Sequence, residues 1–308
     1  MKIAQTLSIN DIYTISTGIV MGTTARLITL KADFRQVPTY PSAYFNNIVF
    51  GFIASALGAI AIPAILSKDF TAITFLVLAV SQFRDFRTTE RESLANLEDS
   101  EFAQRGDAYI DGIAKTFESR SYISLVTAVF TVFVIKVISL PEMLWNIVFG
   151  IIAGFLFMLF CNRFTKGKNI GQICDIKIGK IEVRDSELFV DGMFVTNYLG
   201  TDISREMFIN EGLAVVLEAH DIESRVTIEN HGQSQAVLFE AVRALGVKRY
   251  KFMKRDFPTG KVIIAFVPII RDSEKLLKVV YNTPILENSR KFKQTMKTSF
   301  GGTNEKGD

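Results

Sequence analysis

The chain has few of the residues that build metal centres, disulfide frameworks or nucleophilic sites. It contains two cysteines, Cys161 and Cys174, and two histidines, His220 and His231. Their spacing fits no zinc site, and two cysteines do not make a disulfide framework. We therefore expect no bound metal and no cofactor, and a reducing, cytosolic environment for the chain after Cys161.

An excess of charge of one sign is also missing. The 35 lysines and arginines nearly balance 32 acidic residues, for a net charge of +3, so we expect no nucleic-acid partner. The N-terminal residues MKIAQTLSIND lack the basic region, apolar stretch and cleavage site of a removable signal peptide. The sequence also has no Gly-x-Ser-x-Gly, Walker or other phosphate-cradling motif. These absences favour a protein that is not an enzyme.

Long apolar runs, in contrast, are abundant before Cys161. A membrane-spanning helix needs about 20 mostly apolar residues to cross about 30 Å of hydrocarbon. Five segments are candidates: Ile12–Leu30, Tyr44–Leu66, Phe70–Ser81, Tyr122–Leu140 and Met143–Cys161. The third is short and spans only if its helix extends from Ser67 to Phe86. A re-entrant or interfacial segment is the alternative.

The distribution of lysine and arginine orients these segments. Basic residues gather in the linkers 31–43 and 83–121 and directly after the last span, which places these parts in the cytosol and the N-terminus outside. We predict an α-helical transmembrane bundle of about five spans over residues 1–162, including a cytosolic amphipathic linker at 83–121. A soluble cytosolic α+β domain (163–287) and a polar, disordered tail (288–308) follow.

Small residues within the spans predict close helix packing. They recur at a spacing of four in three spans: Gly18 and Gly22, Gly51 and Ser55, and Gly150 and Gly154. We favour packing inside one chain over homodimerisation. Arg26 and Lys136 each lie one turn from a helix end and are expected to extend to the membrane surface. No acidic residue or histidine lies deep in a span, which counts against a transporter.

The linker 83–121 carries a distinctive motif. Its pattern predicts an amphipathic helix, a break at Gln104–Gly106 and a second helix capped by Asp107. In that helix the run Tyr-Ile-Asp-Gly-Ile-Ala resembles the signature of the YIEGIA family, membrane proteins of spore-forming Gram-positive bacteria, with Asp111 in place of glutamate. The stretch Glu229–Gln233 also resembles this family. The candidate interaction surface comprises Tyr109, Ile110, Asp111, Gly112, Ile113 and Ala114.

This resemblance implies a membrane protein linked to sporulation, in a forespore or mother-cell membrane. It implies no catalytic residues.

The soluble half shows alternating patterns and short helices. Strands over Ile173–Val183 and Leu188–Val195 are expected to form a hairpin, with Asp191–Gly192 read as a turn. Further on, Leu213–Glu218 fits either a helix or a strand. The remaining predictions are a helix capped by Ser204, a strand at Arg225–Glu229, a helix at Gln233–Leu245 ended by Gly246, a strand at Val262–Ile270 and a helix at Ser273–Val280.

Two groups of residues on the predicted cytosolic side could carry function. Weak catalytic candidates are Asp107, Asp111 and His231, to which folding would have to add Asp191 and His220. A basic cluster could hold the domain against anionic lipid, or simply form a solvated face. It comprises Lys248, Arg249, Lys251, Lys254 and Arg255.

Three functions follow from these patterns. The first is a non-enzymatic scaffold or regulator in sporulation, which binds membrane lipids and a protein partner at its cytosolic face. The second is a membrane-associated hydrolase or protease that uses the carboxylates and histidines above. The third is a transporter, against which the lack of buried acidic charge counts. The sequence leaves the oligomeric state open.

Overall fold

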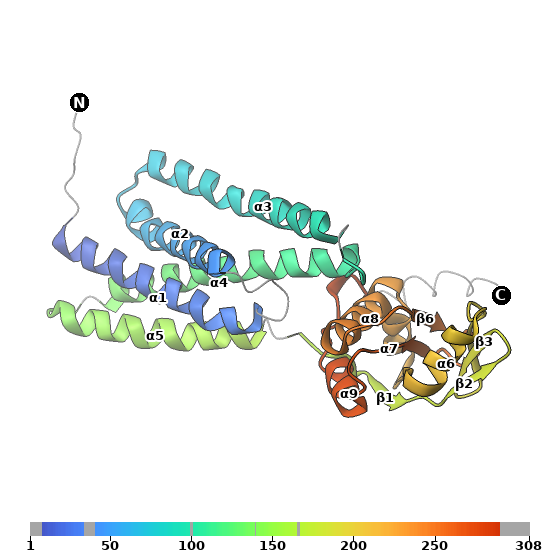
Figure 1. The fold of residues 1–308 in the computed structure, drawn as a ribbon. Helices are drawn as coiled ribbons and strands as arrows, with labels where there is room; N and C mark the ends of the chain where they lie inside the picture. Colours follow the sequence, from blue (N-terminus) through green and yellow to red (C-terminus); the bar gives the residue numbers. More distant parts are fainter. Residues whose placement is uncertain (1–7, 34–40, 99–100, 139, 165–166, 290–308) are drawn as a thin grey trace, which may run out of the picture. The chain divides into compact units, whose positions relative to one another are not determined.

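The fold is given by a computed structural model that describes residues 8–33, 41–98, 101–138, 140–164 and 167–289 (Figure 1). The chain forms two compact units. The helical unit comprises Met1–Ser93 and Ile113–Lys166, and the α/β unit comprises Leu94–Gly112 and Gly167–Asp308. The boundaries 1–162, 163–287 and 288–308 stay a prediction, and residues 290–308 lie outside the described residues. The structure adds that Leu94–Gly112, part of the predicted linker, groups with the α/β unit.

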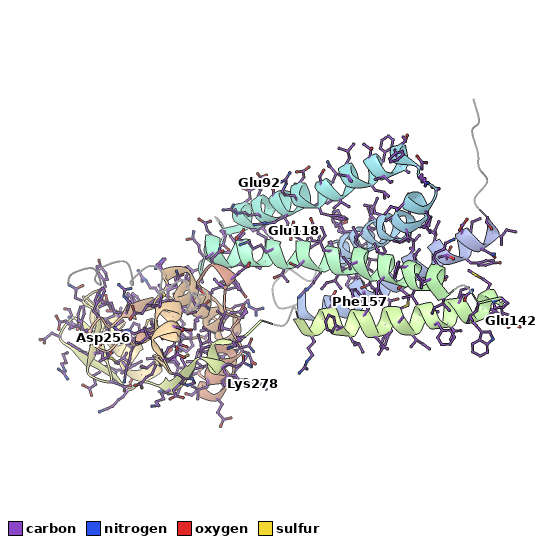
Figure 2. All side chains as sticks on the ribbon, turned by 180° about the vertical axis from the view of Figure 1, so that it is seen from behind. Glu92, Glu118, Glu142, Phe157, Asp256 and Lys278 are labelled. Carbon is purple, nitrogen blue, oxygen red and sulfur yellow. The ribbon has the colours of Figure 1, made fainter. Side chains whose placement is uncertain are left out.

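In the described residues, five long helices make up most of the helical unit. They are α1 (Ile9–Asp33), α2 (Pro41–Leu66), α3 (Phe70–Glu98), α4 (Asp107–Ile138) and α5 (Met143–Phe164). The last residues of the third helix and the first residues of the fourth belong to the α/β unit. Helix α1 packs against α2 and α5. Phe157 of α5, labelled in Figure 2, stacks on Phe130 of α4 with 4.3 Å between ring centroids. Aromatic pairs of this kind fix neighbouring helices in register.

Three helices are long and apolar enough to cross a membrane. They contain Tyr44–Leu66, Asp107–Ile138 and Met143–Arg163, and thus include the second, fourth and fifth predicted spans. The count of five is not confirmed, because neither α1 nor α3 meets the same criterion among the described residues. Helix α1 contains Arg26 and several threonines, and the apolar start of α3 runs directly into Arg84, Asp85 and Arg87.

The helices around residues 83–121 are longer than predicted. Helix α3 runs without interruption from Phe70 to Glu98, so the short apolar segment and the first amphipathic helix are one element. The second amphipathic helix likewise continues into the fourth apolar segment as α4. No proline or glycine lies between these segments, so the backbone has no reason to leave the helix. Separate linker helices were therefore a wrong prediction, whereas the break before Asp107 is confirmed.

Small residues let the helices approach closely. A Cβ atom on Gly22 would lie 2.6 Å from the carbonyl oxygen of Ser124, and one on Gly154 would lie 2.2 Å from the Thr131 hydroxyl. Both neighbours belong to α4 of the same chain. Gly22 and Gly154 therefore contact α4 of the same chain, and the preference for such packing over homodimerisation stays a prediction.

Arg26 and Lys136 do not extend to the membrane surface as predicted. Arg26 is fully buried among helices. Lys136 forms an ion pair with Asp11 of α1, with 2.5 Å between Nζ and Oδ1. Each finds a polar partner on a neighbouring helix, which replaces the solvation that a surface position would offer.

The α/β unit is built on a four-stranded antiparallel sheet in the order β1-β5-β7-β6. Its strands are β1 (Cys174–Ile178), β5 (Leu213–Ala219), β6 (Lys251–Arg255) and β7 (Val262–Phe266). The helices α7 (Ile222–Ile228), α8 (His231–Leu245) and α9 (Ser273–Tyr281) pack against its strands (Figure 1). Strand β7 is buried along its whole length, which explains why its sequence is a continuous apolar run.

A second, three-stranded sheet packs against the first. It consists of β2 (Ile181–Arg184), β3 (Glu187–Val190) and β4 (Met193–Thr196), accompanied by α6 (Asp202–Glu211). Apolar side chains from both sheets and from α6 form one core, including Leu188, Phe208, Val216 and Ile263.

Several predictions in this unit need correction. The predicted strand Ile173–Val183 is two strands in different sheets, β1 and β2. The expected hairpin is confirmed as β2–β3, but the predicted strand Leu188–Val195 is also two strands, β3 and β4. The Asp191–Gly192 turn is confirmed between them, with positive φ at both residues. Leu213–Glu218 is a strand, and the predicted helices over Gln233–Leu245 and Ser273–Val280 are confirmed.

Two further predictions were wrong because local caps were overlooked. The predicted strand Arg225–Glu229 lies largely in α7, whose start is capped by the Asp221 carboxylate accepting the backbone N–H of Ser224 at 2.7 Å. Helix α6 is capped by Thr201, with Ser204 as the partner in a capping box rather than as the cap.

Replacing Gly58 of α2 with alanine tests the packing of the helical unit. A Cβ there would lie 2.3 Å from the backbone carbonyl oxygen of Leu125, which cannot move without shifting α4. We expect a loss of about 1–3 kcal/mol in stability, measured as a lower thermal unfolding midpoint of the purified protein. Gly200→Ala is the control, because no neighbouring atom lies within 4 Å of its Cβ position. Equal midpoints for both variants would contradict this helix contact.

Candidate functional site

The signature run begins at a glycine turn that follows α3. Gly106 has φ +84°, a conformation that glycine adopts without steric cost. Its N–H donates to the Glu98 carboxylate at 3.1 Å, and its carbonyl accepts the N–H groups of Tyr109 and Ile110. The turn thereby ends one segment and starts α4, which places the signature in the first turns of that helix.

Tyr109 is the most deeply anchored residue of the signature that lies in the α/β unit. Its side chain is only 2% exposed, and its hydroxyl donates a hydrogen bond to the Glu240 carboxylate of α8. Glu240 also accepts from Arg243 Nη2 at 2.6 Å. The Tyr109 ring packs against Phe239, with 5.8 Å between centroids. A buried carboxylate thus receives one neutral and one charged donor.

The segment before the signature also contacts α8. Arg105 lies over the Phe239 ring at 5.2 Å and 3.9 Å from the Glu98 carboxylate. The Gln235 amide donates to the Gln104 carbonyl at 2.7 Å. These contacts attach Gln104 and Arg105 to α8.

The edge strand β6 contributes a further contact. The Lys251 ammonium donates to the carbonyl oxygen of Phe102 and lies 4.8 Å from the centre of its ring. Partial burial lowers the pKa of the Lys251 side chain below its ordinary value.

Asp111 and Gly112 lie against residues 286–288 of the same unit. The Asp111 carboxylate accepts from the Asn288 side chain at 3.1 Å. A Cβ on Gly112 would lie 3.5 Å from Leu286, an ordinary contact. Ile110, Ile113 and Ala114 are buried. Five of the six signature residues are therefore buried or hydrogen-bonded to a residue far along the chain.

The second family-like stretch, Glu229–Gln233, lies at the start of α8. A Cβ on Gly232 would lie 2.6 Å from the Ala108 side chain. The buried Gln233 amide donates to the Pro284 carbonyl and accepts from the Leu286 N–H at 2.7 Å. The two stretches that resemble the family thus meet, and Gln233 ties the residues before Ser289 to the same helix. We call Glu98, residues 101–112, α8 and residues 284–289 the signature cluster.

The catalytic candidates have separate surroundings. Asp107 and His231 are exposed at the first residues of α4 and α8. The exposed His220 ring lies 3.2 Å from Asp175, and Asp191 accepts the Lys180 N–H at 2.7 Å. Among the described residues, no group of three histidines, cysteines or acidic residues could hold a metal ion.

Cys174 has the environment of an inert thiol. It is buried, and burial together with the Asp175 charge raises its pKa to about 12. A thiol with such a pKa carries almost no thiolate at neutral pH, and the thiolate is the reactive form.

The basic residues at 248–255 do not form one patch. Lys248 pairs with Glu211, and Arg255 lies 3.6 Å from Glu229. Arg249 and Lys254 lie over the rings of Tyr250 and Phe194. Side chains alternate between the two faces of β6, which separates Lys254 from Lys251. A role at the membrane surface stays a prediction.

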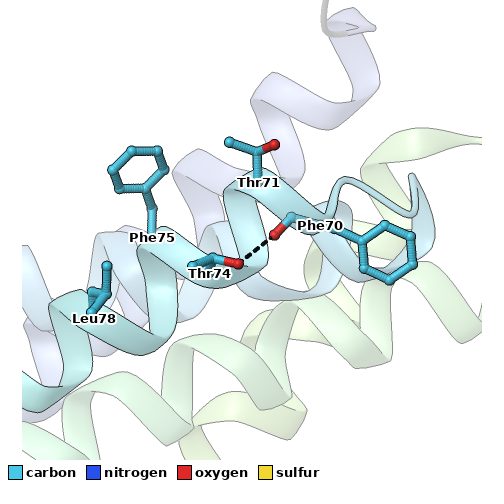
Figure 3. A pocket seen from close by; sticks show the side chains of 5 residues that line it. All are labelled: Phe70, Thr71, Thr74, Phe75 and Leu78. Atoms are coloured by element: carbon cyan, nitrogen blue, oxygen red, sulfur yellow. Dashed lines mark hydrogen bonds between the residues drawn. The ribbon is translucent and has the colours of Figure 1, made fainter.

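A shallow hollow on α3 is lined by Phe70, Thr71, Thr74, Phe75 and Leu78 (Figure 3). All five belong to one helix, and the Thr74 hydroxyl is bonded to the Phe70 carbonyl at 2.8 Å. No second element contributes to the lining, so the hollow is a feature of one helix surface.

Comparison with known proteins confirms the family resemblance of the two stretches that meet at the signature cluster. The model of the YIEGIA protein family matches residues 14–296. The chain belongs to the YIEGIA family. It is also 38% identical over 285 residues to the Bacillus subtilis uncharacterized protein YphB, and the alignment covers 90% of this chain and 93% of that relative. No solved structure matches the chain.

The sequence pointed to the YIEGIA signature but not to its binding partners. The sequence predicts a helix over Gln233–Leu245 and a family-like stretch that ends at Gln233, but no contact of Gln233 or Glu240 with the signature or the residues around it. The available signal was the run Ala236–Ala241, where one glutamate interrupts apolar residues. A buried carboxylate in such a run requires partners, and Tyr109 is one of them.

Tyr109→Phe tests the central hydrogen bond of the signature cluster. It keeps the ring and removes the donor to Glu240, so we expect a loss of about 1–3 kcal/mol. Thermal unfolding of the purified protein measures it, together with faster amide hydrogen exchange in residues 101–112.

Tyr198→Phe is the control, because Tyr198 is 78% exposed. If Tyr109→Phe is as stable as Tyr198→Phe, the Tyr109–Glu240 bond does not hold the cluster.

Proposed function

We propose that this YIEGIA protein is a multi-pass membrane protein that acts as a non-enzymatic scaffold or regulator in sporulation. Its α/β domain lies in the cytosol and carries the signature cluster. The N-terminus lies outside. Membrane lipids and a protein partner are its binding partners.

The observation that supports this proposal is that the polar signature residues form hydrogen bonds within the fold. Tyr109 and Asp111 bond to Glu240 and Asn288, residues far along the chain. Polar side chains held in this way organise a fold, whereas a catalytic site presents its polar groups toward a pocket. The family signature thus holds distant segments of the fold together, and this structural use of its polar groups favours a scaffold or regulator over an enzyme.

Membrane insertion is supported by the three apolar helices, and orientation by the positive residues at one set of loops. The link to sporulation rests on what the YIEGIA resemblance implies. The relative YphB comes from Bacillus subtilis, a spore-forming bacterium.

Complementation of a spore-forming strain that lacks its own copy distinguishes a scaffold from a hydrolase. Asp111→Asn keeps an acceptor oxygen for Asn288 but removes carboxylate chemistry, and His231→Ala removes an exposed imidazole. We expect both variants to restore spore formation fully. Gly232→Leu, which collides with Ala108, should fail to restore it. Loss of spores with Asp111→Asn or His231→Ala at normal protein levels would favour an enzyme.

The proposed orientation has a separate test. A reporter protein that fluoresces only in the cytosol is fused after Asp308. We expect fluorescence from the membrane of the producing cell. An alkaline phosphatase fusion at the same position serves as the opposite control, and activity from that fusion would overturn the cytosolic placement.

A further inference from the structure

Arg26 packs against two other helices of the helical unit, α2 and α4. Its side chain is 0% exposed. The Nη2 group donates to the Asn47 amide oxygen of α2 at 2.5 Å. A Cβ on Gly51 would lie 2.5 Å from Arg26 Cγ, and the guanidinium lies 4.8 Å from the centre of the Phe117 ring of α4. The position of the guanidinium is therefore fixed by packing.

Two donor groups of this guanidinium have no acceptor. Arg26 Nε and Nη1 are buried without a hydrogen-bond partner in the part of the chain that the structure describes. Arginine has five N–H donors and stays protonated in proteins. A buried donor without an acceptor costs about 1–3 kcal/mol, and more when the group is charged. An acceptor that carries negative charge would remove this cost.

Charged residues of α3 and α4 lie near Arg26. Arg120 of α4 is close enough to repel Arg26 electrostatically, and Glu90 of α3 is close enough to attract it. Glu90 is half-buried and attracts Arg26 through its charge, whereas the Arg26 side chain donates its hydrogen bond to Asn47. Both guanidinium groups would attract an anionic ligand.

The site lies where the apolar segments give way to charged residues. Arg120 comes just before the apolar run that begins at Tyr122, and Arg26 is one turn from the charged end of its own apolar run. This boundary corresponds to the depth of lipid phosphates, where basic pockets between helices bind headgroups.

We propose that Arg26, together with Arg120 and Asn47, binds a phosphate group of an anionic phospholipid headgroup or a free phosphate ion. A phosphate provides several negatively charged acceptor oxygens, which could accept from Arg26 Nε and Nη1, the donors that have no hydrogen-bond partner in the described part of the chain. The lipid source rests on the proposed membrane insertion, whereas the free-phosphate source does not.

Native mass spectrometry and thermal unfolding of the full-length protein, purified in neutral detergent and stripped of lipid, test this proposal. The probes are phosphatidylglycerol, phosphatidylcholine and inorganic phosphate. We expect phosphatidylglycerol or inorganic phosphate to bind and raise the unfolding temperature, and phosphatidylcholine to do neither. Binding of inorganic phosphate with an equal rise assigns the free ion as the source. No effect of either anionic probe overturns the proposal.

Variants separate binding from folding. Arg26→Lys keeps a cation but loses donors, and we expect anion affinity to fall at least about tenfold. Arg163→Gln is the control, because Arg163 is an exposed cation at the end of α5, and it should bind as the unchanged protein does.

Glu90→Gln decides between an anion and Glu90 as the acceptor. If Arg26 binds an external phosphate, removing the competing carboxylate should raise the affinity. A destabilised Glu90→Gln protein that binds no anion would show that Glu90 alone neutralises Arg26. This test uses purified protein, so its result does not depend on the outcome of spore complementation.

Discussion

The hydrogen bond from the Tyr109 hydroxyl to the Glu240 carboxylate attaches the family signature to helix α8 of the α/β unit. The packing of the signature in that unit depends on this contact. Both groups are buried, and a buried carboxylate without donors would be costly. Arg243 supplies a second donor to the same carboxylate. The signature tyrosine and the α8 glutamate therefore require one another. This requirement explains why residues before α4 group with strands and helices that follow them by more than a hundred positions.

The glycines of the signature cluster support that contact by their size. Gly106 provides the turn with positive φ from which α4 starts, and Gly232 leaves room for Ala108. Gly112 has ordinary space toward Leu286, so its place in the signature is not explained by a steric limit in the α/β unit. Within the cluster, glycine is required at position 106 by the positive φ of the backbone. At position 232 it is required because Ala108 packs closely against the backbone.

Local sequence signals predicted much of this fold, and long-range contacts account for most of what they missed. The Asp191–Gly192 turn, the helix ended by Gly246 and the break before Asp107 depend on single residues with strong conformational preferences. The segment 225–229 has an alternating pattern, yet the Asp221 cap makes it a helix. The positions of Glu240 and Gln233 opposite the signature depend on tertiary folding, which a periodic pattern does not encode.

Arg26 shows the same limit in the helical unit. Its position near a helix end favours a side chain that reaches the membrane surface. The structure instead buries it beside Asn47 and Gly51, because the absent side chain of Gly51 leaves space for the arginine stem. Gly51 of α2 therefore makes room for the long Arg26 side chain, whereas other glycines let two helix backbones lie close together. The small residues at positions 18, 22, 51 and 154 are thus not equivalent, and only their partners on neighbouring helices tell which role each one has.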